Sequence, residues 1–490
     1  MAKLTTQAGG ISLGRGAAVL AGLATVMTLS RLLPPQDYGT YRQVWLIFFT
    51  LAPVLELGVP QSVSFFGPQI TRERRKTYLA QNGVALLGTG LLTGLCLFSC
   101  ARPIAQLFGN PDLVAPLRAF ALYPAMTMSF NIVEYALITH HRPGTAGWIT
   151  GASAAAQAAI TMGGFLGGAT LAQICLWLGL FALLRWSVAA AAFLFVYRDL
   201  RVTWDWSELR GQLAFALPMG AATMVGLLGR QIDKLVISSR FPPELYAVYA
   251  NGSYDVPLIG ILTMSITAVI VPAIVRARAR GDLAEVQRLW HGAARRVATL
   301  FFPAAVFLFI AAEPFMILLF SAEYAESARP FRIFLLLLPL RIAFYSGFLR
   351  ALGRTGPIFF SSLGALAISF VLALVLIRVP GLGFLGPAIA IVAGSYWAAL
   401  YTIRVALREL GWRWRDYFPW RRLAGTMAVA LAAGAPALLA GALLSAQPAP
   451  PRLLAMGLVY GGVYLTVGEI TRAARLREWL RAVGDTIRQR

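Results

Sequence analysis

Residues 34–41 read PPQDYGTY, and residues 242–249 read PPELYAVY. Both octapeptides have the pattern Pro-Pro-x-x-Tyr-x-x-Tyr, and they align without a gap. The first octapeptide follows the first long apolar run, and the second follows the seventh. Because proline cannot continue a helix, each copy is expected to end the first helix of a repeat. The tyrosines are then expected at the outer membrane interface, where amphipathic aromatic side chains are favoured.

Two further matches extend the repeat in the same order along the chain. Residues 68–74 (PQITRER) resemble 272–278 (PAIVRAR), and 164–169 (GFLGGA) resemble 383–388 (GFLGPA). An even number of apolar runs separates the copies, so both halves have the same orientation in the membrane. Such parallel repeats are typical of transporters in which one half moves against the other. A purely structural repeat is the alternative.

Composition identifies the chain as a membrane protein. Hydrophobic residues make up 58% of the chain and charged residues 13%, and the apolar runs approach the roughly 20 residues that a helix needs to cross a bilayer. Helices satisfy their own backbone groups in lipid. The sequence therefore predicts an all-α polytopic membrane protein with fourteen transmembrane helices, near residues 10–32, 43–66, 78–100, 114–138, 145–166, 170–197, 212–237, 247–272, 297–319, 331–349, 357–379, 383–406, 423–445 and 452–469.

The repeat predicts two parallel six-helix lobes, residues 1–211 and 212–410, followed by two extra helices and a basic tail in 411–490. Arginine and lysine gather in alternate loops, and the basic side is cytoplasmic by the positive-inside rule. Both termini are therefore expected in the cytoplasm. Residues 476–487 form either a basic interfacial helix on anionic lipid or a solvated tail.

Several classes of function are disfavoured. The net charge of +22 lies in short loops, which does not fit a nucleic-acid-binding domain. Cys96, Cys100 and Cys175 lie in apolar runs and predict neither a disulfide framework nor a metal site. No Walker loop is present, and the loops are too short for a catalytic domain. We therefore expect no catalytic residues, no cofactor and no enzymatic activity.

Ionisable residues inside the apolar runs are the candidate functional residues, because charge at bilayer depth is costly and usually faces a partner or a cavity. Four of them are the candidate substrate-binding cations: Arg15, Arg230, Lys234 and Arg341. A positively charged cavity suits an anionic substrate, since arginine binds phosphate in a bidentate manner. Three of them are candidates for coupling to H⁺ or Na⁺: Glu56, Asp233 and Asp255.

Other arrangements of these charges are possible from the sequence. Arg230, Asp233 and Lys234 have the i, i+3, i+4 spacing of one helix face, so Arg230 can pair with Asp233. Arg15 and Glu134 lie near the ends of their runs and can snorkel to the surface. Arg185 can instead form a structural bridge to Glu134 or Glu56.

Residues 30–41 (SRLLPPQDYGTY) and 55–60 (LELGVP) closely resemble the opening signature of the polysaccharide transporter family. Residues 233–237, 331–354 and 381–388 are similar to its second half. This family contains the O-antigen, teichuronic-acid and exopolysaccharide repeat-unit flippases, within the multidrug/oligosaccharidyl-lipid/polysaccharide flippase superfamily. The resemblance covers essentially the whole chain. Ala247 departs from it, because the second half often has glycine there.

The resemblance implies two lobes forming a V around a central cavity. It implies that an undecaprenyl-diphosphate-linked oligosaccharide passes from the inner to the outer leaflet of a bacterial inner membrane by alternating access. The four cations would then line the cavity. Membrane lipids and the lipid-linked oligosaccharide are the expected partners, polysaccharide polymerase and glycosyltransferases are candidate ones, and a monomer is expected.

Two transport alternatives remain open. A lipid II flippase for peptidoglycan fits the same number of helices and the same basic cavity. A cation-coupled multidrug exporter of the same superfamily would instead use the acidic set, Glu56, Asp233 and Asp255. A membrane-embedded ligase or glycosyltransferase is a further class that the short outer loops disfavour.

Overall fold

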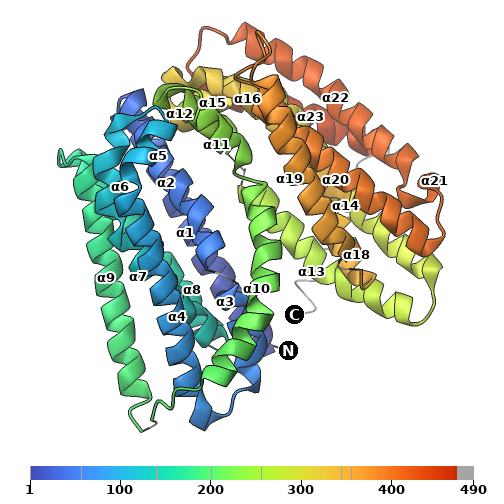
Figure 1. Ribbon diagram of the computed structural model, residues 1–490. Helices are drawn as coiled ribbons and strands as arrows, with labels where there is room; N and C mark the ends of the chain where they lie inside the picture. The colour runs from blue at the N-terminus through green and yellow to red at the C-terminus, as the bar shows by residue number, and fades with distance from the viewer. Residues whose placement is uncertain are drawn as a thin grey trace. The chain divides into compact units, whose positions relative to one another are not determined.

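A computed structural model of the protein describes residues 2–56, 58–139, 142–199, 201–254, 257–343, 345–354 and 356–471. The chain forms two compact units, Met1–Ala247 and Val248–Arg490 (Figure 1). The described residues form α-helices and short 3-10 helices and no strands, which confirms the predicted all-α class. The boundary at 211/212 was predicted from the sequence repeat, and it stays a prediction.

The first unit consists of helices that the chain enters in the order α1 (Ala2–Leu32), α2 (Pro35–Leu55), α3 (Val59–Phe66), η1 (Gly67–Gln69), α4 (Arg72–Ser99), α5 (Ala101–Leu107), η2 (Pro111–Leu113), α6 (Val114–Phe120), α7 (Leu122–Thr139), α8 (Pro143–Leu166), α9 (Leu171–Val196), α10 (Trp206–Leu228) and α11 (Ile232–Ser238). Helix α12 (Pro243–Gly252) contains the boundary between the units.

The second unit continues with α13 (Pro257–Ala279), α14 (Leu283–Ile310), α15 (Ala312–Phe320), η3 (Ala322–Ser327), α16 (Ala328–Leu335), α17 (Leu337–Leu340), η4 (Arg341–Ala343), α18 (Tyr345–Ala351), α19 (Gly356–Leu376), α20 (Gly386–Leu410), α21 (Trp414–Tyr417), α22 (Trp420–Leu443) and α23 (Ala449–Ile470).

The duplicated octapeptide separates helices as predicted. Helix α1 ends at Leu32, Pro34 occupies the N-cap position of α2, and α12 begins at Pro243. The tyrosines, however, are buried: Tyr38 is 0% exposed and Tyr246 is 2% exposed. The expectation that they face the membrane interface is wrong, because their rings pack inside the protein.

The other two repeat matches have different outcomes. Residues 164–169 connect α8 to α9, and 383–388 connect α19 to α20, so this pair has the same local role in both halves. Residues 68–74 begin a helix after the extended N-cap Thr71, whereas residues 272–278 continue inside α13. Val275 replaces Thr71 in the aligned second copy, but the Thr71 side chain makes no capping hydrogen bond, so this match holds in sequence and not in local structure.

Nine described helices are long and apolar enough to span a membrane. The number is ten if the bent pair Pro111–Phe120 and Leu122–Glu134, at 43°, is one span. The chain is therefore a multi-pass membrane protein, and the count of fourteen stays a prediction. Several expected spans are interrupted. The breaks follow Leu55 in 43–66, Leu228 in 212–237 and Leu335 in 331–349.

Three candidate residues lie at these interruptions. Glu56 is the C-cap of α2, Arg230 lies between α10 and α11, and Arg341 begins η4. Figure 1 shows the change of direction between α10 and α11. Irregular backbone at membrane depth is tolerated where it is buried in protein or lines a water-filled cavity. The fold thus places candidate charges where the helices are discontinuous.

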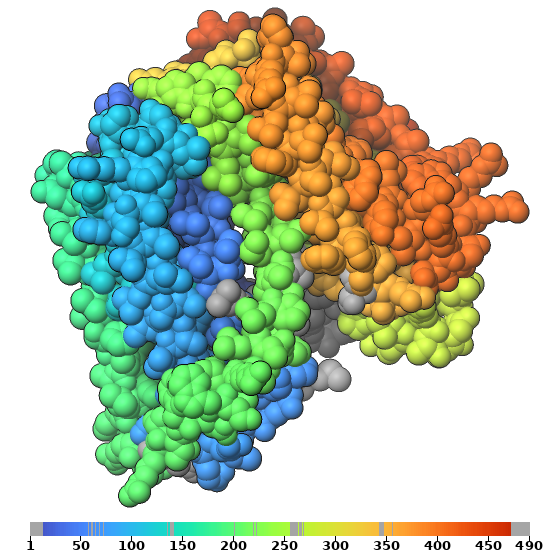
Figure 2. Space-filling model, in the orientation of Figure 1, coloured from blue at the N-terminus to red at the C-terminus, as the bar shows by residue number. Residues whose placement is uncertain are grey.

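The connection between α9 and α10 ends in a strong helix cap. Asp205 Oδ1 accepts hydrogen bonds from the backbone N–H groups of Ser207 and Glu208, each at 3.0 Å. Its Oδ2 lies 2.9 Å from Arg74 Nη2. The pKa of Asp205 is below its ordinary value. The hydrogen bond from the Glu208 N–H is the largest cause, and the Ser207 N–H and the Arg74 guanidinium lower the pKa further. In Figure 2 this connection projects beyond the helix ends at the bottom of the view.

We expect Asp205→Ala to lower the thermal stability of the protein at neutral pH. The pKa of Asp205 is lower in the folded protein than its value of about 3.9 in the unfolded chain. The ionised cap therefore stabilises the folded protein fully above about pH 3.9, and this stabilisation is lost as the pH falls through the folded-state pKa. The unfolding temperature of detergent-solubilised protein, measured at pH 7 and pH 3, tests this. An equal difference from wild type at both pH values would contradict the charged cap.

Candidate functional site

Two groups of side chains in the first unit contain charged candidate residues. We call the first the Glu134 cluster, consisting of Arg15, Glu56, Asn131, Glu134 and Thr150. Arg15 Nη2 donates to Glu134 Oε1 at 2.9 Å, and Thr150 Oγ1 donates to Glu134 Oε2 at 3.2 Å. Asn131 Nδ2 donates to Glu56 Oε1 at 3.2 Å. Both carboxylates therefore have hydrogen-bond donors on neighbouring helices.

Close packing of α1 against α8 places Arg15 in this cluster. A Cβ on Gly14 would lie 1.9 Å from the carbonyl oxygen of Gly147, and one on Gly151 would lie 3.3 Å from that of Gly14. Small residues permit such approach of two membrane helices. Arg15 follows Gly14 directly, and Thr150 lies one turn of α8 after Gly147. The glycines thus position two partners of Glu134.

Arg185 differs from its predicted role. Its Nη2 donates to Thr127 Oγ1 at 3.3 Å, and its guanidinium carbon lies 4.1 Å from the centre of the Phe130 ring. Glu134 is bonded to Arg15 and Glu56 to Asn131, so the alternative bridge from Arg185 to either acid is wrong. A cation–π contact stabilises the arginine in its place.

We expect the Arg15–Glu134 pair to contribute little stability. Their side chains are 57% and 31% exposed, and both residues are expected to reach water near the ends of their apolar runs, where such pairs are worth at most about 1 kcal/mol. A double-mutant cycle of Arg15→Ala and Glu134→Ala, measured by chemical unfolding, should give a coupling energy of this size. Additive effects of the two changes would show that the pair does not interact in the membrane protein.

The second group lies at the break between α10 and α11. Lys234 Nζ donates to the carbonyl oxygen of Arg230 at 3.2 Å and lies 3.8 Å from Asp233 Oδ1. Asp233 is 1% exposed, whereas Arg230 is exposed. The predicted single helix face is wrong, because Gly229 and the following turn separate Arg230 from α11.

Helix α11 is tied to α2 by a network of neutral side chains, which we call the Gln43 network: Thr40, Gln43, Asn110 and Ser238. Gln43 Nε2 donates to Ser238 Oγ at 2.9 Å, and Asn110 Nδ2 donates to Gln43 Oε1 at 2.7 Å and to Thr40 Oγ1 at 2.9 Å. Gln43 and Ser238 are 0% exposed. Ser238 lies one helical turn after Lys234, so the network fixes the helix that carries Lys234.

This network was not predicted from the sequence, because its members carry no charge. The signal was present as isolated amides and hydroxyls beside long apolar runs, including Asn110 immediately before Pro111. Buried polar groups require hydrogen-bond partners. Searching only for ionisable residues therefore overlooked the groups that hold α11.

The two copies of the octapeptide meet within the first unit. A Cβ on Gly39 would lie 2.1 Å from the carbonyl oxygen of Pro243. Arg42 Nη1 donates to Tyr38 Oη at 2.8 Å, and Tyr246 Oη donates to the carbonyl oxygen of Arg42 at 3.5 Å. The motif that reveals the repeat is thus also a packing motif.

The remaining candidates lie elsewhere in the chain. Arg341 is half-buried in η4 of the second unit. Asp255 lies outside the described residues. The structure places the Lys234 ammonium at the backbone carbonyl oxygen of Arg230, and it pairs Arg15 with Glu134. The convergence of all four cations on one chamber stays a prediction.

The helices and their discontinuities define a multi-pass membrane transporter fold. Residues 28–329 match the family described as Polysaccharide biosynthesis protein. Because the match extends over more than half of the 490 residues, the chain belongs to this family, as its resemblance to the polysaccharide transporter family predicted. A search of curated proteins finds no match.

Solved structures with the same fold are transporters. A lipid II flippase MurJ in an inward closed conformation has a TM-score of 0.74 at 14% identity, covering 94% of this chain and 98% of that one. An inward-facing multidrug resistance MATE family transporter of the MOP superfamily scores 0.65 at 15%, covering 80% and 94%. A MOP superfamily transporter from Pyrococcus furiosus, described as having a binding pocket of reverse polarity, scores 0.58 at 15%, covering 84% and 96%.

Proposed function

We propose that the protein translocates an undecaprenyl-diphosphate-linked oligosaccharide from the inner to the outer leaflet of a bacterial inner membrane, with both termini cytoplasmic. The observation that carries this proposal is the placement of cations at helix breaks in a polysaccharide biosynthesis family chain. Arg230 and Lys234 flank the start of α11, and Arg341 begins η4. The oligosaccharide is assembled by glycosyltransferases and consumed by a polymerase, and the transporter acts as a monomer.

The charges at the α10–α11 break suit a diphosphate. Two cations, Arg230 and Lys234, accompany one carboxylate, Asp233, so the formal charge is 2 − 1 = +1. The acid is buried beside Lys234 while Arg230 is exposed. An exposed guanidinium can bind a phosphate oxygen pair in a bidentate manner. The substrate headgroup would thus compensate charge that is costly in the membrane.

Alternating access requires a ligand that binds the two states differently. Three carboxylates are candidates for coupling to H⁺ or Na⁺: Glu56 and Asp233 among the described residues, and Asp255 outside them. Glu56 caps the end of α2 directly before the Gly58 turn. Asp233 belongs to the short helix that follows the other break. Each acid is placed where a change in helix direction would alter its surroundings.

A lipid II flippase is the second candidate, favoured by the fold shared with the MurJ structure. Lipid II also presents a diphosphate, so the same cations would bind it. Growth rescue of cells depleted of their own lipid II flippase separates the two proposals. If the protein rescues these cells but does not restore polysaccharide export in a strain that lacks its repeat-unit flippase, lipid II is the favoured substrate.

The cation-coupled multidrug exporter is the third candidate and shares the MATE fold. Its cationic substrates would need free acidic groups. Glu56 instead accepts a hydrogen bond from Asn131, and Asp233 lies beside Lys234. Increased resistance to cationic drugs on overexpression, lost in Glu56→Gln, would favour this candidate.

We expect Arg230→Ala/Lys234→Ala to reduce export in a bacterial strain that lacks its own repeat-unit flippase and is rescued by this protein. Loss of each phosphate contact costs at least about 1.4 kcal/mol, or tenfold. Surface polysaccharide per cell is the measurement. Arg240→Ala removes an exposed arginine near the same helix and should leave export unchanged. Equal export by both variants would contradict the assignment.

A further inference from the structure

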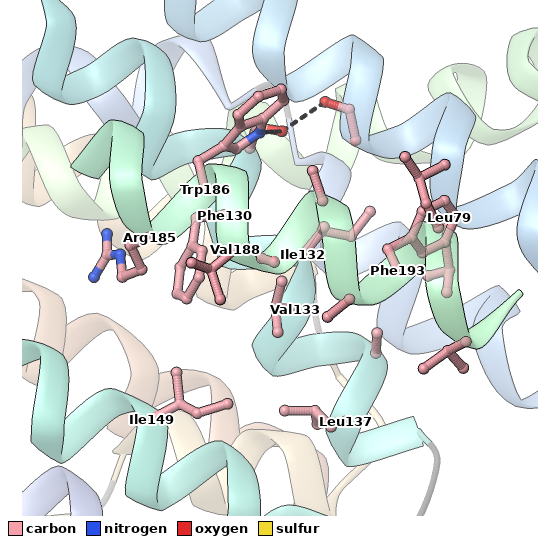
Figure 3. A pocket seen from close by; sticks show the side chains of 18 of the residues that line it. Leu79, Phe130, Ile132, Val133, Leu137, Ile149, Arg185, Trp186, Val188 and Phe193 are labelled. Atoms are coloured by element: carbon pink, nitrogen blue, oxygen red, sulfur yellow. Dashed lines mark hydrogen bonds between the residues drawn. The ribbon is translucent and has the colours of Figure 1, made fainter. Parts of the chain in front are cut away.

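The first unit contains an apolar crevice that the transport proposal does not use. Its volume is about 1200 Å³, and it lies between α4, α7, α8 and α9. Figure 3 shows Phe130 and Val188 on one side of the opening and Ile149 and Leu137 on the other. Aliphatic and aromatic side chains make up most of its wall. We call it the α8–α9 crevice.

The crevice opens on a surface that faces lipid. Helix α9 lies at the edge of the first unit (Figure 1). Only 11% of its apolar 18-residue stretch is buried inside the protein. Leu184 is 63% exposed and Val188 is 62% exposed, and both line the crevice. In a membrane-spanning helix such exposed apolar side chains contact hydrocarbon. Whatever fills the crevice in the bilayer therefore enters from the lipid.

One end of the crevice is charged. Arg75, in the first turns of α4, Arg142, before α8, and Asp199, after α9, all belong to its lining. Two cations and one acid give this end a formal charge of 2 − 1 = +1. In the orientation proposed above this end is cytoplasmic, where the leaflet carries anionic lipid. The charge complements an anionic headgroup at the same depth.

The apolar length of the crevice matches one leaflet. Val196 lies near the charged end and Arg185 lies deeper in the wall, eleven residues earlier on α9. At about 1.5 Å per residue this spans about 16 Å. The hydrocarbon core is about 30 Å thick, so the crevice reaches to about its middle. Trp186 Nε1 of the wall donates a hydrogen bond of 3.1 Å to Ser129 Oγ (Figure 3), and Arg185 Nη2 donates to Thr127 Oγ1 at 3.3 Å.

We propose that the α8–α9 crevice binds an anionic diacyl phospholipid of the cytoplasmic leaflet. Its phosphate lies at Arg75 and Arg142, and its acyl chains run along α9 toward Arg185. Chains that extend through one leaflet fit this depth, whereas a long polyprenyl chain would exceed it. The site is separate from the cations assigned to the transported substrate.

Photo-cross-linking tests the proposal on the purified full-length protein in liposomes. The probe is phosphatidylglycerol carrying a diazirine near the end of one acyl chain, and labelled peptides are located by mass spectrometry. We expect labelling of α8 and α9. Val188→Trp fills the crevice and should lower this labelling about tenfold, whereas Leu180→Trp, on the same exposed helix outside the crevice, should not.

The headgroup contacts are tested by Arg75→Gln/Arg142→Gln, which should lower labelling about tenfold, the factor for about 1.4 kcal/mol of lost charge-assisted bonding. Arg295→Gln/Arg296→Gln in the second unit is the matched control. Equal labelling by a phosphatidylcholine probe would overturn the proposal in favour of unselective lipid. Displacement of the probe by polyprenyl diphosphate but not by unlabelled phosphatidylglycerol would overturn it in favour of the substrate chain.

Discussion

Replacing Gly58 with alanine is expected to destabilise the first unit by at least about 3 kcal/mol and to abolish transport. Gly58 has φ +72°, a left-handed conformation that L-residues with a Cβ disfavour. The new Cβ would also lie 2.2 Å from the carbonyl oxygen of Ala216 and 2.7 Å from the backbone nitrogen of Gly220. Backbone atoms cannot move aside as a flexible side chain can, so α10 would have to shift.

This effect reaches the candidate site because Gly58 forms the turn between α2 and α3. Glu56 caps α2 two residues earlier, and α10 leads directly to the break that contains Arg230. A displaced α10 would therefore move both Glu56 and Arg230. The amount of folded protein, followed by size-exclusion chromatography and thermal unfolding, measures the change. Gly226→Ala is the control, because a Cβ there meets nothing within 4 Å. Equal stability of the two variants would contradict the close contact.

Replacing Gln43 with leucine is expected to cost about 2–4 kcal/mol of stability and to lower transport further than this loss explains. Gln43 is 0% exposed, and its side chain bonds to both Asn110 and Ser238. Leucine would remove the hydrogen bonds that Gln43 makes to Asn110 and Ser238, and Asn110 would keep its bond to Thr40. It would also release the end of α11, and with it the position of Lys234.

A matched control separates this network from general effects of the substitution. Gln36→Leu changes the same residue type on the same helix, but its side chain is exposed. Gln36→Leu should retain wild-type stability and transport. Unfolding of both variants is measured in the same detergent, and translocation by both is measured in the same liposomes. A Gln43→Leu protein as stable as Gln36→Leu would show that the network does not hold α11.

The sequence predicted the helical class and the helix ends at Pro34 and Pro243, because proline acts locally. It did not predict that α10 would end before Arg230, since periodicity alone extends an apolar run through a turn. The facing of Tyr38 and Tyr246 was wrong for a related reason: amphipathic aromatics suit an interface, but here tertiary packing buries them.

The sequence named candidate site residues, and their roles stay predictions. Charge at bilayer depth singled out Arg15, Glu56 and Lys234 without an alignment, yet charge does not specify partners. Arg15 bonds to Glu134, and Arg185 lies on Phe130. Both outcomes depend on which helices meet, and the Gly14–Gly147 contact that decides the first is a property of two distant segments. The neutral Gln43 network has no charge pattern to reveal it.

The most direct test of the account is translocation in liposomes that contain only the purified protein. Fluorescent undecaprenyl-diphosphate oligosaccharide is placed in both leaflets, and an impermeant quencher reports the fraction that crosses. We predict rapid crossing with wild-type protein, at least about tenfold slower crossing with Arg230→Ala/Lys234→Ala, and wild-type rates with Arg240→Ala. Equal rates for wild type and the double variant, or no crossing above protein-free liposomes, would contradict a cation-guided diphosphate flippase.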